Sequence, residues 1–175
     1  GSGCPLEHTP MRNKRSPQRT NSGITVSVDA PELWSPESPK LYEFSAELGA
    51  DKVDSYFALR DVCVGKDEKG RPCLMLNGRP YFHSGVLDQG YWPDGLYTAP
   101  SDAALVYDIE LMKSMGFNML RKHIKIEPLR WYYHCDRLGM LVWQDMMNGG
   151  GKYDPITISA PLITRRHKND HDYKR

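Results

Sequence analysis

Two helix–glycine–strand segments follow one another in the second half of the chain, and this repetition constrains the fold more than any other feature. Gly116 and Gly139, 23 positions apart, each end an amphipathic segment and precede a short apolar stretch, residues 117–120 and 140–143. Another compact apolar stretch, residues 81–87, precedes the first of these segments. Apolar strands that alternate with amphipathic helices are typical of a parallel sheet covered by helices. Both a closed barrel and a doubly wound sheet satisfy this pattern.

The two helices are marked by their ends and by the spacing of their apolar residues. Ser101 or Asp102 is the expected cap of the first helix, and Pro128 suits the first turn of the second. A glycine in the left-handed conformation is expected to end each helix. The predicted buried faces are Leu105, Ile109 and Met112 on the first helix, and Leu129, Tyr132, Cys135 and Leu138 on the second.

The first half of the chain has a different pattern, in which apolar and polar residues alternate between Pro, Gly and Asp breaks. Short antiparallel strands are expected around residues 24–28, from residues 41–44 onward, and from residues 56–59 to an end near residues 62–64. A charged linker is expected at residues 65–71, followed by a hairpin whose tight turn is Asn77-Gly78. These strands are too few for a self-contained sandwich, which needs about seven.

Composition excludes several classes of function. The net charge of +1 gives no global field to attract nucleic acid or an acidic membrane, and no apolar run approaches the ~20 residues of a membrane span. The four cysteines lack zinc-site spacing, and no nucleotide-binding glycine motif is present. We therefore expect no metal and no cofactor. A disulfide between Cys63 and Cys73 stays open, although free thiols are favoured.

Candidate binding residues lie where the predicted parallel strands end, because function gathers at the carboxyl ends of such strands. Asp88 and Trp92 follow the first strand, Arg121 and His123 the second, and Asp145 the third. Charged and amide groups suit sugar hydroxyls, and Trp or Tyr rings suit the C–H face of a pyranose. Tyr91 and Trp92 are the preferred aromatic platform, since they lie in a Gly/Pro-rich loop.

Some of these residues can also be explained by structural roles that involve no sugar. Arg121 can form a salt bridge that joins strand ends, and His123 is equally well explained as a core histidine. Trp143 lies within a strand and is expected to be core rather than platform.

Three groups of segments, in order along the chain, form a recognisable pattern: residues 33–42 and 55–60, residues 76–80, and residues 116–123 (Gly-Phe-Asn-Met-Leu-Arg-Lys-His), 127–128 and 135–145. Together they resemble glycoside hydrolase family two, which includes β-galactosidases, β-glucuronidases and β-mannosidases. The first group resembles that family's immunoglobulin-like sandwich, the second the entry into its first barrel strand, and the third the start of its barrel.

The resemblance implies an α/β chain with a β part: a partial immunoglobulin-like β-sandwich followed by the first βα units of a (β/α)8 TIM barrel. The implied divisions are a disordered tail at 1–23, sandwich at 24–64, linker and hairpin at 65–80, barrel at 81–161 and a basic tail at 162–175. It also implies a β-galactosidase-like glycosidase, active in carbohydrate metabolism, that retains anomeric configuration by means of two carboxyl groups.

This chain departs from the family where the chemistry occurs. The family's His-rich segment is replaced by Leu87-Asp88-Gln89-Gly90-Tyr91-Trp92, and His123 follows Arg121 by two positions rather than three. The Asn-Glu pair that carries the family's acid/base does not occur in the sequence. We therefore assign no catalytic residue and expect a fragment that is inactive alone.

The expected partners are a carbohydrate and either the missing part of the barrel or an oligomer partner. No nucleic acid or membrane is expected. A non-catalytic carbohydrate-binding or interaction module and an unrelated small α/β domain are the alternatives. Three strands of an eight-stranded barrel leave an open edge, which predicts poor solubility without a partner.

Overall fold

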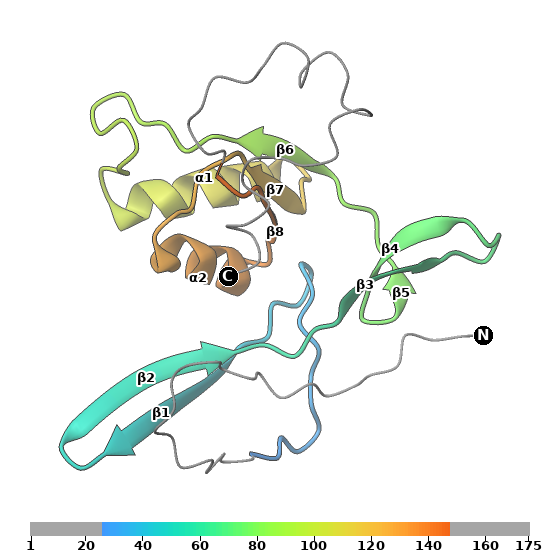
Figure 1. The fold of residues 1–175 in the computed structure, drawn as a ribbon, viewed down its shortest axis with the longest axis horizontal. Helices are drawn as coiled ribbons and strands as arrows, with labels where there is room; N and C mark the ends of the chain where they lie inside the picture. The colour runs from blue at the N-terminus through green and yellow to red at the C-terminus, as the bar shows by residue number, and fades with distance from the viewer. Residues whose placement is uncertain (1–25, 148–175) are drawn as a thin grey trace, which may run out of the picture. The chain divides into compact units, whose positions relative to one another are not determined.

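The computed structural model describes residues 26–147, which divide into two compact units at the boundary between His83 and Ser84. Each unit is coloured by position along the chain in Figure 1. The first unit contains only antiparallel sheets, and the second contains a parallel sheet with helices. The fold is therefore mixed, with antiparallel sheets followed by a small parallel β-α-β-α-β segment.

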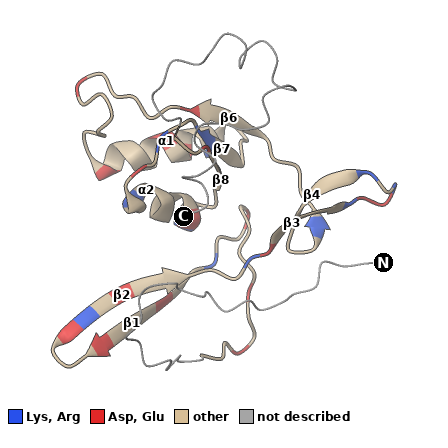
Figure 2. Ribbon diagram, in the orientation of Figure 1, with Lys and Arg blue, Asp and Glu red and all other residues tan. Residues whose placement is uncertain are grey.

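The first unit begins its strands with a long hairpin, β1 (Tyr42–Leu48) and β2 (Asp51–Phe57). Its base is held by aromatic packing, since the Tyr42 and Phe57 rings stack with centroids 5.3 Å apart. Charged residues populate the hairpin toward its turn (Figure 2), and most of its side chains are exposed. The hairpin is thus a two-stranded element with little core of its own.

A second antiparallel sheet has the order β3 (Val62–Lys66), β4 (Pro72–Leu76), β5 (Arg79–Pro80). The predicted Asn77-Gly78 turn is confirmed: both residues have positive φ, 52° and 75°, as a tight two-residue hairpin turn requires. The predicted linker at 65–71 is wrong in part. Its first two residues belong to β3, and the rest form a turn in which Asp67 accepts hydrogen bonds from the backbone N–H groups of Lys69 and Arg71.

Trp34 is the buried anchor of the first unit. Its side chain is fully enclosed, with the Arg60 guanidinium 4.5 Å from the ring centroid, and its backbone carbonyl accepts a hydrogen bond from Asn77. The predicted strand at residues 24–28 is wrong over residues 26–28, which are not in a sheet and where Val26 is exposed. Alternation alone does not make a strand when no neighbouring strand pairs with it. Ile24 lies outside the described residues.

The second unit is a parallel sheet of β6 (Gly85–Asp88), β7 (Met119–Lys122) and β8 (Leu141–Gln144), in that order. The helices α1 (Asp102–Ser114) and α2 (Leu129–Leu138) connect the strands. The strand predicted at 81–87 begins later, at Gly85. Three predicted helix ends are confirmed: Ser101 caps α1, and Gly116 and Gly139 have φ of 88° and 74°. Pro128, predicted in the first turn of α2, is instead its N-cap residue, one position earlier.

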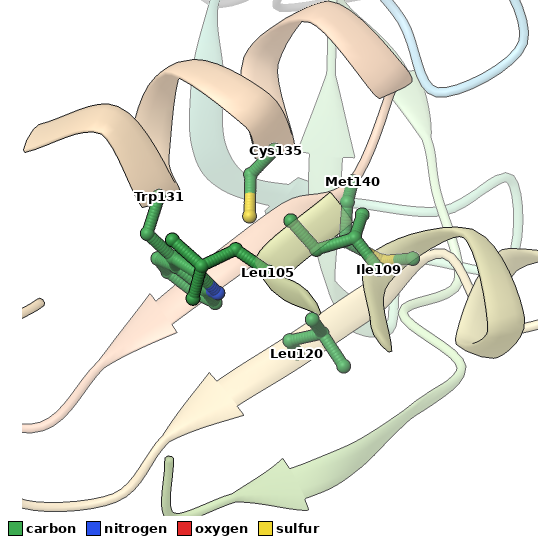
Figure 3. Packing of buried hydrophobic residues seen from close by; sticks show 6 residues of the cluster. All are labelled: Leu105, Ile109, Leu120, Trp131, Cys135 and Met140. Atoms are coloured by element: carbon green, nitrogen blue, oxygen red, sulfur yellow. The ribbon is translucent and has the colours of Figure 1, made fainter. Parts of the chain in front are cut away.

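The core of this unit lies between the helices and one face of the sheet (Figure 3). Leu105 and Ile109 from α1 meet Leu120 from β7, as their spacing predicts. The predicted face of α2 is wrong at its first residue, because Leu129 is 87% exposed and Trp131 is buried instead. The remaining buried residues of the cluster are Trp131, Cys135 and Met140.

The structure also bears on the cysteines and on membrane spans. Cys63 and Cys73 form no disulfide with each other, because Cys63 is opposite Met75, and Cys73 opposite Gly65, in the β3–β4 register. Across residues 26–147, no helix combines the length and the apolar character that crossing a membrane requires.

Candidate functional site at the carboxyl ends of the parallel strands

The carboxyl ends of β6, β7 and β8 meet at one edge of the parallel sheet. Asp88, Lys122 and Gln144 are direct neighbours in the register of the three strands. Because side chains alternate across a strand, these residues share a face with Val86, Leu120 and Val142, which pack into the helix-covered core. Leu87, Arg121 and Trp143 lie on the opposite face, where all three are exposed.

A buried lysine lies at the centre of the helix-side half of this edge. Lys122 is 1% exposed, and its ammonium lies 2.8 Å from Asp88 Oδ2 and 3.0 Å from Glu127 Oε1. It also lies 4.2 Å from the centroid of the Trp131 ring, a cation–π contact. Two carboxylates and an aromatic face therefore compensate the charge that burial takes out of water.

Lys125 joins the loop after β7 to the loop after β6. Its ammonium lies 2.8 Å from Glu127 Oε1 and donates to the backbone carbonyls of Gly90 and Tyr97, at 2.7 and 2.8 Å. Gly90 has φ of 65°, and a Cβ there would lie 2.3 Å from Glu127 Oε1. We call Asp88, Lys122, Lys125 and Glu127 the charge cluster. It ties both loops to the strand ends.

Gln144 extends this network to β8. Its amide nitrogen donates to the backbone carbonyls of Lys125 and Asp145, at 2.8 and 2.7 Å. The Tyr132 hydroxyl donates to the Gln144 carbonyl oxygen and accepts from the backbone N–H of Glu127. Burial raises the pKa of Tyr132, so this hydroxyl remains protonated and able to donate.

On the exposed half of the edge, Arg121 and Asp145 form a bidentate ion pair. Arg121 Nε and a terminal guanidinium nitrogen each lie 3.0 Å from one carboxylate oxygen of Asp145. These hydrogen bonds lower the pKa of the Asp145 carboxyl and raise the pKa of the Arg121 guanidinium. The salt bridge between strand ends that the sequence suggested for Arg121 is therefore present.

His123 lies beside this pair and is partly exposed rather than enclosed in the core. Its Nδ1 lies 3.1 Å from the Gln89 side-chain nitrogen, and its backbone N–H donates to the Asp88 carbonyl. Asp88, Arg121, His123 and Asp145 therefore lie at one edge of the sheet, as predicted. They do not form one group, because Asp88 belongs to the charge cluster and the other three lie in the more exposed half.

The aromatic residues are arranged differently from the sequence prediction. Trp92 packs against the hydrophobic core, and its indole N–H is buried without a partner among the described residues. Tyr91 and Tyr97 are the exposed pair of the same loop, with hydroxyls 2.8 Å apart. Trp143, expected in the core, is 45% exposed on the open face of the sheet. A binding role for Trp92 stays a prediction.

Sequence reasoning missed Lys122, Lys125 and Glu127 as a connected group. The one available signal was the position of Lys122, two residues after the buried Leu120 on the same face of an otherwise apolar strand. Within the described range, no cluster of three or more His, Cys, Asp or Glu side chains is placed to hold a metal ion.

Comparison with known proteins assigns the chain to a family. The profile of the glycosyl hydrolases family 2 matches residues 6–60. "Beta-galactosidase 2" from Enterobacter cloacae is 34% identical over 121 residues, which are 68% of this chain and 12% of that protein. The chain belongs to glycosyl hydrolases family 2. This family-2 chain therefore spans about an eighth of the length of that curated relative.

Solved structures agree with the fold of the family-2 chain. A GH2 β-galacturonidase from Eisenbergiella tayi, bound to galacturonate, superposes with a TM-score of 0.59 at 29% identity, over 66% of this chain and 20% of that one. The β-glucuronidase of Parabacteroides merdae has the same TM-score at 23% identity, over 73% of this chain and 16% of that one, and supports the fold alone. The mixed α/β arrangement is thus one that occurs within larger family-2 enzymes.

Proposed function

We propose that this chain forms the carbohydrate-binding strand ends of a glycosidase that hydrolyses O-glycosyl bonds. Residues 24–64 would be the end of its immunoglobulin-like sandwich, 65–80 the linker and hairpin, and 81–161 the start of its TIM barrel. The observation that carries this proposal is the convergence of Arg121, His123 and Asp145 at the carboxyl edge of a parallel sheet. That edge is where barrel enzymes place their active sites.

The exposed face of the sheet is consistent with an incomplete barrel. Leu87, Arg121 and Trp143 alternate with the helix-facing residues and project from the face that the helices leave uncovered. In a closed barrel this face would be the interior, which side chains of the remaining strands fill. We therefore propose that further barrel strands or a partner chain cover Leu87 and Trp143.

Catalysis by this chain alone is not expected. Retaining glycosidases need two carboxyl groups about 5–5.5 Å apart, one to attack the anomeric carbon and one to act as acid and base. The carboxylates of the charge cluster and Asp145 are each held by cations: Asp88 by Lys122, Glu127 by two lysines, and Asp145 by Arg121. Such groups suit binding and orientation better than proton transfer, which benefits from a carboxyl of raised pKa.

Binding and turnover of simple glycosides test this proposal. We expect the purified chain to bind a methyl β-pyranoside in isothermal titration and to leave aryl β-glycosides unhydrolysed. Arg121→Ala should weaken binding by about tenfold, the effect of losing one charged hydrogen-bond donor. Arg130→Ala is the matched control, because it removes an exposed arginine paired with Asp102 on the helices. Equal losses in both variants would contradict the site.

A second candidate is a non-catalytic carbohydrate-binding module. It is favoured by the same engaged carboxylates, since binding requires no free acid or base. The two candidates predict different results when further family-2 barrel strands are supplied as a separate chain. A fragment of an enzyme should gain aryl-glycosidase activity when co-expressed with the remainder of a family-2 barrel, whereas a binding module should not.

A further inference from the structure

We infer that Asp145 is a specificity-determining residue, which sets this strand-end site for uncharged pyranosides and against uronic acids by occupying the guanidinium of Arg121. This inference rests on the proposed function and names the substrate class of the same site. The similar proteins act on both kinds of sugar by their names, β-galactosidase and β-galacturonidase, so the family alone leaves this choice open.

The first observation in support is the bidentate geometry of the Arg121–Asp145 ion pair. A planar guanidinium recognises a carboxylate through two parallel N–H groups, and that is the edge of Arg121 that Asp145 occupies, with both contacts at 3.0 Å. The lowered pKa of Asp145 keeps it ionised through the neutral range. A sugar carboxylate would therefore approach a guanidinium whose bidentate edge already holds a negative charge.

The second observation is that the neighbouring cations, Lys122 and Lys125, are already paired with carboxylates. Lys122 is enclosed between Asp88 and Glu127, and Lys125 is held by Glu127 and two backbone carbonyls. Among the residues described at this edge, the three positive charges of Arg121, Lys122 and Lys125 are thus matched by three carboxylates. These three cations are therefore already engaged and are poorly placed to compensate a uronate, and the desolvation of an uncompensated carboxylate is costly.

The other exposed groups near the pair can form hydrogen bonds with a sugar bearing hydroxyls. The Gln89 and His123 side chains contact each other at the ends of β6 and β7, and the hydroxyls of Tyr91 and Tyr97 meet in the following loop. Amide, imidazole and phenol groups all donate or accept hydrogen bonds. A neutral pyranose can therefore exchange hydrogen bonds with these groups and leave the Arg121–Asp145 pair intact.

The test compares two ligands that differ only at carbon 6, methyl β-glucopyranoside and methyl β-glucuronide, by titration of the intact chain at pH 7. The wild-type chain should bind the neutral sugar more tightly. Asp145→Asn keeps a polar side chain of the same size but removes its charge. It should move the affinity ratio toward the glucuronide by about tenfold, the effect of removing one nearby like charge. The readout is the ratio of the two affinities, so a loss of affinity that is common to both sugars leaves the comparison intact.

Two further variants identify the origin of that change. Asp67→Asn is the matched control, because it breaks a similar exposed carboxylate–arginine pair, Asp67 with Arg71, in the first unit, and should leave the ratio unaltered. The double variant Arg121→Met/Asp145→Asn should lose the gain in glucuronide binding, since the gain acts through Arg121. This reversal is not expected from a variant that has merely loosened the fold.

The outcomes separate this inference from the proposed function. A wild-type chain that prefers the glucuronide, or an Asp145→Asn variant with an unchanged ratio, overturns the inference and leaves carbohydrate binding standing. A wild-type chain that binds neither sugar removes the proposed function itself, and the inference falls with it.

Discussion

At the scale of single residues, Lys122 has the environment that is least usual for its chemistry. A lysine that is 1% exposed needs partners for its charge, and it finds them in Asp88, Glu127 and the ring of Trp131. The network is dense enough that a Cβ at Gly90 would lie 2.3 Å from Glu127 Oε1, so a side chain there would force the cluster to shift. Both features lead to stability predictions that the rest of the fold would not suggest.

Lys122→Met should lower the free energy of unfolding by about 3 kcal/mol, the cost of removing one partner from a buried ion pair. Methionine can still pack on Trp131, but Asp88 loses its ammonium partner and Glu127 retains only Lys125. Arg130→Met is the control, since its pair with Asp102 is exposed and should contribute less than about 1 kcal/mol. Urea unfolding followed by far-ultraviolet circular dichroism measures both. Similar losses would contradict a buried, charge-compensated Lys122.

Gly90→Ala should destabilise the second unit more than Gly116→Ala does. Both glycines have positive φ, so each alanine incurs about 1 kcal/mol or more of backbone strain. Only at Gly90 does the new methyl group also meet the charge cluster, 2.3 Å from Glu127 Oε1, whereas nothing lies within 4 Å at Gly116. Urea unfolding of the two variants gives the comparison, and equal losses would show that the loop after β6 is not tied to the cluster.

At the scale of secondary-structure elements, α2 carries a cysteine that reports on opening of the core. Cys135 is 1% exposed, and burial, followed by the charge of Asp136, raises the pKa of its thiol. A thiolate-specific reagent at pH 8 should therefore modify Cys63 and Cys73 first and reach Cys135 only on unfolding. Peptide mass mapping after timed labelling measures the order. Early modification of Cys135, or a disulfide-linked 63–73 peptide, would contradict it.

The helix α1 carries a carboxyl group that folding disfavours in its charged form. Partial burial and the charge of Asp88 raise the pKa of Asp108, and Lys122 offsets part of this. A raised pKa in the folded state means that the stability it contributes is present at low pH and is lost as pH rises through the folded-state value. Asp108→Asn should therefore be more stable than wild type at pH 7, with a difference that shrinks toward pH 3. Thermal melts across this range test it, and a constant difference would contradict it.

Element boundaries were predictable where a single residue determines the local conformation. Ser101, Gly116, Gly139 and the Asn77-Gly78 turn all act through their own backbone or side-chain preferences, and the structure places each as expected. Prediction failed where the outcome depends on a distant neighbour. Residues 26–28 alternate in polarity but have no partner strand, and Leu129 has helical spacing but is on the exposed side of α2.

The candidate site likewise has features that the sequence predicts and features that it does not. That Arg121, His123 and Asp145 would meet followed from topology, because the ends of parallel strands share an edge. The burial of Lys122 and the clamp formed by Lys125 could not be predicted, since they depend on the path of two loops in space. Tyr91 is exposed as predicted, whereas the inward packing of Trp92 depends on the path of the same loop.

At the scale of the whole molecule, the chain corresponds to a small part of much longer family-2 proteins, 12% of one β-galactosidase and 20% of one β-galacturonidase. The exposed apolar residues of the parallel sheet, Leu87 and Trp143, are the surface that the proposal leaves for the rest of a barrel. On this account the strand ends form a carbohydrate-binding edge even before the barrel is complete.

The most direct measurement of that claim is a map of backbone amide chemical shifts of the isotopically labelled chain during titration with methyl β-glucopyranoside. The account predicts that the largest changes fall at Asp88–Gln89, Lys122–His123 and Gln144–Asp145, at the ends of β6, β7 and β8. Changes confined to the β1–β2 hairpin or to the outer surfaces of α1 and α2, or no saturable change at any amide, would contradict it.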